Sequence, residues 1–594
     1  MVVQLICNQQ VVGSSPTGSY KGTNSKFQVS WVRFPSSALF AEVAQLVERW
    51  PERVKKVPCF FQLGGEEKMN AMQAMRMQLN AAYTENGDLA YKSTGSACLD
   101  FFSLCGGMRK NLSDLDVLFA KAYAENPVVA IKILFYMRNI RGGLGERNSF
   151  RVLLKELAQF YPETVRQIVY AVPEYGRWDD LLVLLDTPVK DDVIALIKGQ
   201  IEKDKKAMEA GKAASEADVD AAQGQGAGSV SLLGKWLPSI NTSSKESVAR
   251  AKIVSGALGM RAVEYRKLCS ALRREIKILE DNLRRKDYTF DYSKQPSQAM
   301  LRYKKAFMRN DEERYKAFLN KVVEQAAKVA RGEEVPEEER VKLNTKTLYP
   351  YQIVAPIINY PGNRNLTPEQ ELPLEASWKA LDRGVFGSRT IVVRDGSGSM
   401  YGSGDFAAIN IATSLALLFA EQLDGAYRNS FITFSSEPRL VQIPENADTL
   451  KKKLNFISKF NDCTTTDIAK VYSLILQVAQ AGNVPKEEMI ERVLIISDME
   501  FNFCTGDSSK STFEFYKQKF EEAGYELPEI VFWNVEARDT HLPVTMDEKG
   551  VKLVSGASAN LFADVVSGDL KVVTPYEFML KMLEPYAEFD KVAA

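Results

Sequence analysis

The sequence contains a single histidine, His541, and only seven cysteines among 594 residues. A serine or cysteine nucleophile activated by histidine, or a histidine-ligated metal, would have to use that one residue. We expect His541 at the surface, in the segment 538–543 and away from the motifs described below, so conventional hydrolase chemistry is not predicted. The cysteines are scattered and form no C-x-x-C pair. This spacing argues against a zinc site or a disulfide framework and predicts a cytoplasmic protein.

Long apolar runs are also missing. None approaches the length of a transmembrane helix, so no membrane partner is predicted. The 76 basic and 76 acidic residues cancel, but they are unevenly distributed. Residues 69–390 contain 49 Lys and Arg against 41 Asp and Glu, whereas residues 391–594 contain 19 against 30. The stretch 231–320 is strongly basic, with 20 against 10. Such asymmetry indicates a polyanionic partner for the basic half.

Residues 1–68 lack the patterning of a folded domain. Segments such as 27–35 and 42–49 resemble translated transfer-RNA genes, and the codons of residues 64–68 would be rich in purines, as in a ribosome-binding site. We therefore expect translation to start at Met69 and exclude residues 1–68 from the fold argument as a spurious N-terminal extension. A targeting leader is the alternative, although the stretch has no apolar core followed by a small-residue cleavage site.

The most informative motif is Asp395-Gly396-Ser397-Gly398-Ser399, which follows the apolar segment 391–393. It places one carboxylate and two hydroxyls on a single turn at the C-terminal end of a predicted strand. That edge is where open α/β sheets bind their ligands. Oxygen donors of this kind suit a hard divalent cation such as Mg²⁺, which keeps several waters and leaves a position for an incoming group.

The surrounding pattern predicts an α/β domain over residues 389–594. Helix-length amphipathic segments, such as 407–423 and 468–479, alternate with short apolar segments. Strands that alternate with helices form a parallel, doubly wound, Rossmann-like sheet. The predicted strands lie at 391–393, 431–434, 493–496, 530–533 and 551–554.

The motif resembles the metal-ion-dependent adhesion site of von Willebrand factor A domains. In that family two further loops complete the site, and this chain matches them with Thr466 in the segment 464–467 and with Asp498 after the strand 493–496. The resemblance implies Mg²⁺, or another divalent cation, and a site that holds a partner rather than one that breaks bonds. The implied metal ligands are Asp395, Ser397, Ser399, Thr466 and Asp498.

An alternative is the same fold without a bound ion. Arg394 directly precedes Asp395 and could pair with it, in competition with a cation. Glu500 follows Asp498 closely and is expected to be a solvated carboxylate or an outer neighbour of the site.

The preceding half is predicted to be an all-α module in two parts, 69–206 and 231–388. Pro127 stands at an expected helix start. The Gly-rich segment 141–147 is expected to connect two helices, because no strand precedes it and no Gly-Lys-Ser/Thr follows it. Residues 207–230 are rich in Ala, Gly and Gln and are predicted to be a flexible insertion.

A nucleic-acid-binding surface is predicted within the basic stretch. Along a helix expected at about 264–286, four basic residues fall on one face at about 3.6 residues per turn. A second basic group follows, with Tyr303 and Phe307 between its members. The alternative is a solvated charged face, which the charge excess alone does not exclude. The predicted RNA-binding residues are Arg266, Arg273, Lys277, Arg284, Arg302, Lys304, Lys305 and Arg309.

The order of the two parts resembles the Ro autoantigen family, which joins a TROVE module to a von Willebrand A domain. It is more similar still to a related bacterial, plant and fungal family with the same layout. The resemblance implies HEAT-like helices closed into a ring, a basic surface for small structured RNAs, a cavity for single-stranded RNA ends and, in bacterial relatives, cooperation with RNA-processing enzymes. The insertion at 207–230 bears on whether such a ring closes. The resemblance is carried by 139–147, 176–180, 235–239, 395–400, 497–501 and 532–534.

These observations favour a non-enzymatic RNA-binding scaffold, a ribonucleoprotein component that binds small non-coding or misfolded RNA. Its metal site would recruit a carboxylate-bearing partner, such as an RNA-processing enzyme, or stabilise the domain. The first alternative is a metal-dependent protein–protein adaptor that binds no RNA. The second is a metal-dependent nuclease or phosphatase, for which the only spare carboxylates near the motif are Asp467 and Glu500.

Overall fold

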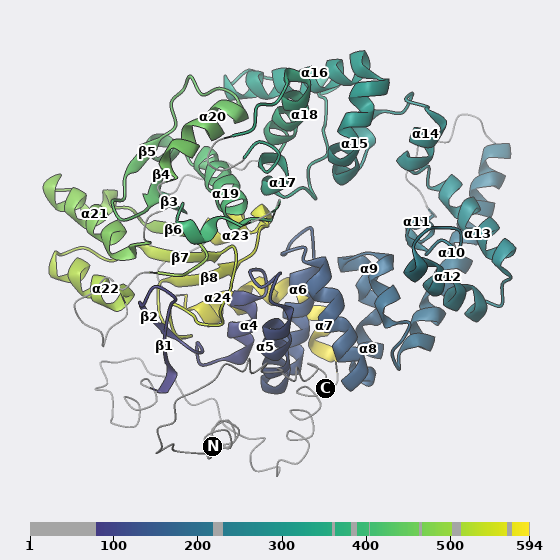
Figure 1. Ribbon diagram of the computed structural model, residues 1–594, viewed down its shortest axis with the longest axis horizontal. Coiled ribbons are helices and arrows are strands. Elements are labelled where there is room, and N and C mark those ends of the chain that lie inside the picture. The colour runs from purple at the N-terminus through teal and green to yellow at the C-terminus, as the bar shows by residue number, and fades with distance from the viewer. Residues whose placement is uncertain are drawn as a thin grey trace, which may run out of the picture.

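The computed structural model describes residues 79–217, 230–358, 363–381, 389–402, 404, 406–461, 466–501, 512–566 and 573–592. The predicted N-terminal extension, 1–68, lies outside these residues, as do Thr464 and Thr465. A helical module is joined to an α/β domain with a mixed six-stranded sheet. Figure 1 shows the helices in an arc that leaves the sheet at α4 and returns to it at α17 and α18.

The sheet has the order β5-β4-β3-β6-β7-β8 and is parallel except for its edge strand β5. The five predicted strands are confirmed, and β5 is an addition to them. All residues of β3, β4, β6, β7 and β8 are buried, as expected for parallel strands covered by helices on both faces. The strands are β3 (Thr390–Asp395), β4 (Ser430–Phe434), β5 (Leu440–Gln442), β6 (Arg492–Ser497), β7 (Glu529–Asn534) and β8 (Val551–Ser555).

The helices of the α/β domain include the two predicted from amphipathic segments, now α19 and α21. They are α19 (Ala408–Gln422), α20 (Leu450–Ile457), α21 (Ile468–Ala481), α22 (Thr512–Glu522), α23 (Phe562–Val566) and α24 (Pro575–Leu583), followed by the 3₁₀ segment η10 (Glu584–Lys591).

The helical module begins after a short hairpin, β1 (Ala81–Tyr83) and β2 (Leu89–Tyr91). Pro127 is the first residue of α6, as predicted, because proline lacks only a donor that a helix start leaves unused. The first helices are α4 (Ala97–Leu104), α5 (Leu112–Glu125), α6 (Pro127–Arg138), α7 (Arg147–Phe160), α8 (Pro162–Ile168), α9 (Val172–Tyr175) and the 3₁₀ helix η2 (Trp178–Leu184). The later ones are α10 (Lys190–Ala217), α11 (Leu233–Trp236), α12 (Lys245–Ala257), α13 (Ala262–Glu275), α14 (Leu279–Arg285), α15 (Ser297–Asn310), α16 (Glu312–Ala330), α17 (Pro350–Val354) and α18 (Pro368–Lys379).

Two boundaries differ from the prediction. Helix α10 continues to Ala217, so the segment predicted as a flexible insertion starts too early at 207; residues 218–229 lie outside the described ones. The single helix expected at 264–286 is two helices, α13 and α14, because Lys277 between them has a left-handed φ of 46°. Leu272 packs in the main core and Leu279 in a second core around α14–α16, so the chain turns where it passes between cores.

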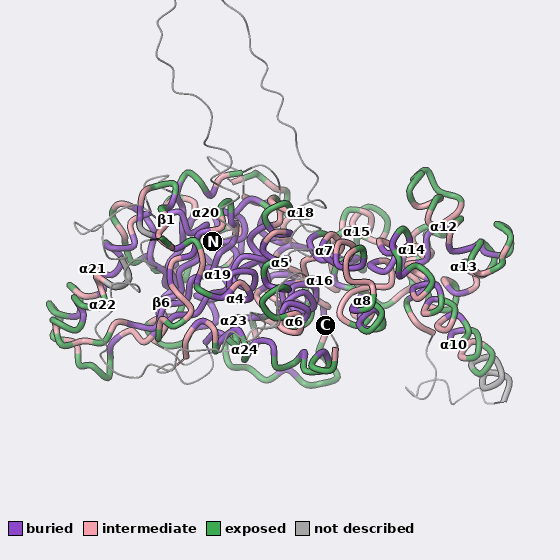
Figure 2. The backbone as a smooth tube through the Cα atoms, turned by 90° about the horizontal axis from the view of Figure 1, so that it is seen from below, coloured by how far each residue is buried: buried purple, intermediate pink, exposed green. Residues whose placement is uncertain are grey.

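The main hydrophobic core is continuous from α4 through α13 into the sheet. In Figure 2 the buried backbone is concentrated around α4, α19 and α23, whereas α12 and α13 are largely exposed. The C-terminal segment packs on the first helices of the module: the ring of Phe589 in η10 stacks on Phe135 of α6 at 4.3 Å between centroids. Glu588 accepts hydrogen bonds from Tyr170 and Tyr175. Helix α4 packs against β8 and helix α17 packs against α19, so the two parts of the protein are joined at both ends of the helical module.

Candidate metal centre and nucleic-acid cavity

Strands β3 and β6 are hydrogen-bonded neighbours at the centre of the sheet, where the strand order changes direction. This is the switch point at which α/β sheets of this type bind ligands. Asp395 is the last residue of β3 and Asp498 directly follows β6. The local apolar runs that form the two strands therefore bring both predicted carboxylates to one edge.

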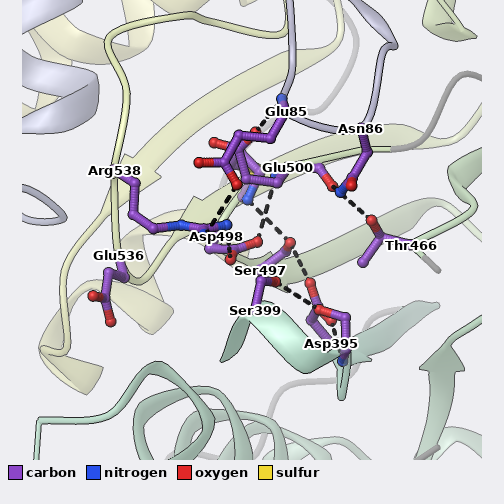
Figure 3. A network of polar contacts seen from close by, with 12 residues as sticks. Glu85, Asn86, Asp395, Ser399, Thr466, Ser497, Asp498, Glu500, Glu536 and Arg538 are labelled. Atoms are coloured by element: carbon purple, nitrogen blue, oxygen red, sulfur yellow. Dashed lines mark hydrogen bonds and ion pairs between the residues drawn. The ribbon is translucent and has the colours of Figure 1, made fainter. Parts of the chain in front are cut away.

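Four of the five predicted metal ligands are gathered there, and Figure 3 shows Asp395, Ser399 and Asp498 among them. Asp395 Oδ1 accepts the backbone N–H of Ser397 at 2.8 Å, and the hydroxyls of Ser397 and Ser399 are 3.0 Å apart. The Ser399 hydroxyl also hydrogen-bonds Asp498. Ser497, which the sequence did not single out, donates its hydroxyl to Asp395 Oδ2 at 2.6 Å. Two carboxylates and two further hydroxyls thus form a compact set of oxygen donors.

The electrostatics of this set fit a divalent cation. Asp395 and Asp498 are 0% and 2% exposed. Burial, followed by the charge of Asp498, raises the pKa of Asp395 to about 7. Burial also raises the pKa of Asp498, against the charge of Arg538, whose Nη2 donates to Asp498 Oδ2 at 3.0 Å. Two desolvated carboxylates are stabilised in their charged form by a nearby positive charge, and Arg538 supplies part of it.

Thr466 and Arg394 differ from what was expected. The Thr466 hydroxyl donates to the backbone carbonyl of Glu500 at 2.6 Å, so it joins the neighbouring loop rather than the four gathered ligands. The guanidinium of Arg394 is buried and donates to Thr413, to the carbonyl of Phe460 and to Asn461. These partners come from α19 and the segment after α20, and none is a carboxylate.

A cluster of three or more Asp, Glu, His or Cys arranged for a metal is not present within the part of the chain that the structure describes. The set at β3 and β6 is a different kind of site, because hydroxyl oxygens make up half of its donors. If an ion is bound, Asp395, Asp498, Ser397 and Ser399 would hold it and leave its open side at Ser399, whose neighbour Gly398 is also exposed.

The turn of the β1–β2 hairpin covers the loop that follows β6. The backbone N–H of Glu85 donates to Glu500 Oε2 at 2.8 Å, and the Asn86 side chain donates to the Glu500 carbonyl at 2.7 Å. Glu85 also pairs with Arg538, Oε2 to Nη1, at 3.1 Å. Glu500 is therefore buried rather than solvated, and Arg538 bridges Glu85 to Asp498.

The expectation for His541 was wrong. It is only 9% exposed, and its Nε2 lies 3.5 Å from Glu500 Oε1. The cause is a tertiary contact: Leu542 pairs with Tyr91 of β2 through two backbone hydrogen bonds, which fix the 538–543 loop beneath the hairpin. No local pattern in the sequence marks that pairing.

A second feature, a cavity of about 1630 Å³, lies between the helical module and the α/β domain. Eleven of its lining residues are Lys or Arg and five are Asp or Glu. Six are aromatic: Trp178, Trp236, Tyr303, Tyr349, Tyr351 and Phe406. The basic residues are Arg109, Lys110, Arg138, Arg141, Arg147, Arg151, Arg177, Lys235, Arg250, Arg273 and Arg302.

Three arginines that line one wall of the cavity are held by a buried ionic network. Asp180 is fully buried and accepts from Arg138 Nε at 2.9 Å and from Arg151 Nε at 2.6 Å. It also accepts the backbone N–H of Arg177 at 2.9 Å. The Arg177 guanidinium lies over the indole of Trp236, 3.9 Å from the ring centroid. The network joins α6, α7 and η2, so it holds a charged and aromatic surface in a fixed position.

The Gly-rich turn forms the adjoining wall. A Cβ at Gly143 would lie 2.1 Å from the carbonyl oxygen of Tyr136, and Gly145 has a positive φ of 69°. Glycine fits the close approach at position 143 and the left-handed conformation at position 145, and any other residue would require the chain to rearrange. The turn connects α6 to α7, as predicted, and it also places Arg141 and Arg147 on the cavity.

The predicted RNA-binding residues divide between the cavity and the outer surface. Arg273 and Arg302 line the cavity. Arg273 is bound to the chain itself, since its guanidinium donates to the carbonyls of Gly234 and Leu237 and to Ser239. Arg284 pairs with Asp281 at 2.8 Å. The helix break at Lys277 separates residues that were expected to share one face. The other predicted residues, which do not line the cavity, are Arg266, Lys277, Arg284, Lys304, Lys305 and Arg309.

Most of the cavity's basic residues were missed because they come from the less charged first part of the helical module. A signal was present: the segments 139–147, 176–180 and 235–239, which carried the family resemblance, all contribute to the lining. The sequence had assigned 141–147 to a helix connection rather than to a binding surface.

The fold thus combines a helical module with an α/β domain of switch-point topology, and family models match both parts. A model described as Domain of unknown function (DUF2828) matches residues 84–197 and 245–355. A second, Domain of unknown function (DUF7788), matches residues 389–573. The gap in the first match contains the segment 207–230.

Particular proteins are similar over most of the chain. The uncharacterised protein L728 of Acanthamoeba polyphaga mimivirus is 29% identical over 537 residues, which are 85% of this chain and 88% of that protein. The crystal structure of the RO (RSR) protein of Deinococcus radiodurans is similar at 15% identity and a TM-score of 0.41, over 80% of this chain and 100% of that one.

Proposed function

We propose that this protein is a non-enzymatic RNA-binding scaffold of the Ro-like type and that the cavity is its RNA-binding site. The observation that carries the proposal is the excess of positive charge on the cavity wall, eleven basic against five acidic residues. Phosphate contacts from such residues provide most of the affinity of proteins for nucleic acid.

The aromatic residues favour single-stranded RNA over a duplex. Sites for single strands combine a positively charged groove with aromatic side chains on which bases stack. Trp178 and Trp236 are partly exposed and adjoin Arg177, and Tyr349 and Tyr351 also line the cavity. Because the walls come from both parts of the chain, the cavity depends on how the helical module packs against the α/β domain.

The α/β domain supplies the second element of the proposal, a von Willebrand A-type metal centre. Asp395, Asp498, Ser397 and Ser399 would hold Mg²⁺, which when bound provides a coordination position for an oxygen of a partner. The burial of Asp395, Asp498 and Ser397 and the hydrogen bond between the two serine hydroxyls support this assignment. The Thr466 hydroxyl donates its hydrogen to the carbonyl of Glu500 and keeps its oxygen lone pairs for an ion.

An enzymatic role is not favoured by the arrangement. A general base must lie within hydrogen-bonding reach of its substrate. His541 and Glu500 are both buried under the β1–β2 hairpin, and neither lines the cavity.

Among the described residues, no helix combines the length and apolar character needed to cross a bilayer.

The test is to purify the tagged full chain from its own host at low salt and to sequence any nucleic acid that accompanies it. Discrete small RNAs that dissociate as salt is raised are expected. If no RNA is recovered and protein partners are instead released by a chelator, the protein is a metal-dependent adaptor. Turnover of labelled RNA in Mg²⁺ would show that it is an enzyme.

A further inference from the structure

The loop that follows β3 belongs both to the metal edge and to the cavity. Ser399, at the metal edge, is exposed. A few residues later Gly404 and Phe406 line the cavity, and the Phe406 ring lies 5.1 Å from that of Tyr351. A Cβ at Gly402, between these positions, would lie 3.6 Å from Lys110 Nζ. The chain therefore leads from the metal edge to the cavity wall within one short loop.

The loop that follows β7 makes the same connection. Glu536 lines the cavity, and two residues later Arg538 donates to Asp498 at 3.0 Å. Lys110, also on the cavity wall, pairs with Glu536, Nζ to Oε1, at 2.6 Å. Lys110 is 55% exposed in its side chain, so it remains accessible at this junction.

The charges at the metal edge determine what can bind there. Asp395, Asp498, Glu500 and Glu536 are all acidic, and Arg538 and Lys110 only partly compensate them. A phosphate would be repelled by this edge in the absence of a cation. A divalent cation on Asp395 and Asp498 reverses that preference and accepts phosphate oxygen as a ligand.

We propose that the cavity and the metal edge are one continuous nucleic-acid site. A single RNA strand leaves the cavity past Lys110, and one of its phosphates occupies the open coordination position beside Ser399. The ligand of the metal centre is then a phosphodiester rather than a protein carboxylate. This inference rests on the proposed RNA binding by the cavity, and it adds that only RNA long enough to leave the cavity depends on the metal.

The test compares phosphate and phosphorothioate forms of a single-stranded RNA on the full chain. Mg²⁺ prefers oxygen ligands, whereas a softer ion such as Cd²⁺ accepts sulfur. In Mg²⁺ the long phosphorothioate RNA should bind about tenfold more weakly than its phosphate form, the effect of one charged contact. The ratio of the two affinities, phosphate to phosphorothioate, should return to near one in Cd²⁺ and in chelator. A short RNA confined to the cavity should bind equally well in both forms under all three conditions.

Variants locate the contact. Asp498→Asn, checked for an unchanged melting temperature, should abolish the difference between phosphate and phosphorothioate RNA in Mg²⁺. Lys110→Gln should weaken long RNA more than short RNA, whereas Lys121→Gln, exposed on α5 and outside the cavity lining, should weaken neither.

Two results would overturn the inference while leaving RNA binding intact. One is an identical phosphorothioate ratio in Mg²⁺, Cd²⁺ and chelator. The other is Mg²⁺-dependent binding of an acidic peptide that long RNA does not displace, which would assign the open position to a protein carboxylate. Failure of any RNA to bind would instead refute the proposed function.

Discussion

Replacing the unpaired arginines of the cavity should remove the salt-sensitive part of RNA binding. Arg141, Arg147 and Arg302 are exposed on the cavity wall, and none forms an ion pair with a carboxylate of the described residues. Arg141 donates to the carbonyl of Glu174 at 3.1 Å, which leaves its charge uncompensated. These three residues are therefore the best placed to contact phosphates.

The magnitude follows from counterion release. Each phosphate contact to a single strand contributes about 0.7 to the slope of log K against log salt concentration. Three contacts contribute about 2, which corresponds to a roughly 20-fold fall in affinity between 50 and 200 mM salt. The triple variant Arg141→Gln/Arg147→Gln/Arg302→Gln should lose that part of the slope. Fluorescence polarisation with a labelled single-stranded RNA over a KCl series measures it directly.

The matched control carries the same change of charge on the outer surface, as Arg266→Gln/Lys277→Gln/Arg284→Gln. These residues do not line the cavity, so the slope should stay close to that of the unmodified protein. An equal decrease of the salt slope in both variants would show only a nonspecific effect of charge. A decrease in the outer-surface variant alone would refute RNA binding in the cavity and would favour the helix surface predicted from the sequence.

Three further predictions concern stability and metal binding. Asp180→Ala should lower the free energy of unfolding by about 3–5 kcal/mol in urea denaturation, because it leaves Arg138 buried without its partner. Phe589→Ala should lower the free energy of unfolding by about 3–5 kcal/mol in the same assay, since its fully buried ring stacks on Phe135. Arg538→Gln should strengthen Mg²⁺ binding about tenfold in calorimetry, because it removes a competing positive charge from Asp498.

Each of these three variants has a control substitution of the same kind that should have little effect. Asp186→Ala removes an exposed pair with Lys155 and should cost less than about 1 kcal/mol. Leu580→Ala, at a residue 41% exposed on α24, should cost about 0.5 kcal/mol or less. Arg428→Gln, at an exposed position before β4, should leave Mg²⁺ affinity unchanged. A loss of stability in either of the first two controls as large as that of its paired variant would contradict the assigned interaction. So would a rise in Mg²⁺ affinity in Arg428→Gln as large as that in Arg538→Gln.

Local pattern was sufficient for the elements that bury continuous apolar sequence. The five predicted strands and the helices α19 and α21 were found because their residues are buried along their length or on one stripe. Strand β5 was missed because it has three residues, of which only Val441 is buried. The hairpin β1–β2 was missed for a similar reason, since its strands are also three residues long.

In the candidate site, too, some features could be predicted from the sequence and others could not. Asp395 and Asp498 could be predicted because each ends an apolar strand, and parallel neighbours bring such ends together. The orientation of Thr466 toward the Glu500 carbonyl could not, because it depends on how the loop after β6 is held by Glu85 and Asn86 from more than 400 residues away in the sequence. The burial of His541 depends on the same hairpin.

By itself the sequence determined the class of each half, an all-α module and an α/β domain, and the position of Asp395 and Asp498 at strand ends, because periodicity and strand-end motifs are local properties. The tertiary structure decided which basic residues face one another. Arg109, Arg141, Arg177 and Arg302 belong to segments far apart in the chain, and they share a cavity only because the arc of helices closes on the sheet. Charge density along the sequence indicated the outer helix surface, but the closed arc gathers positive charge on its inner wall.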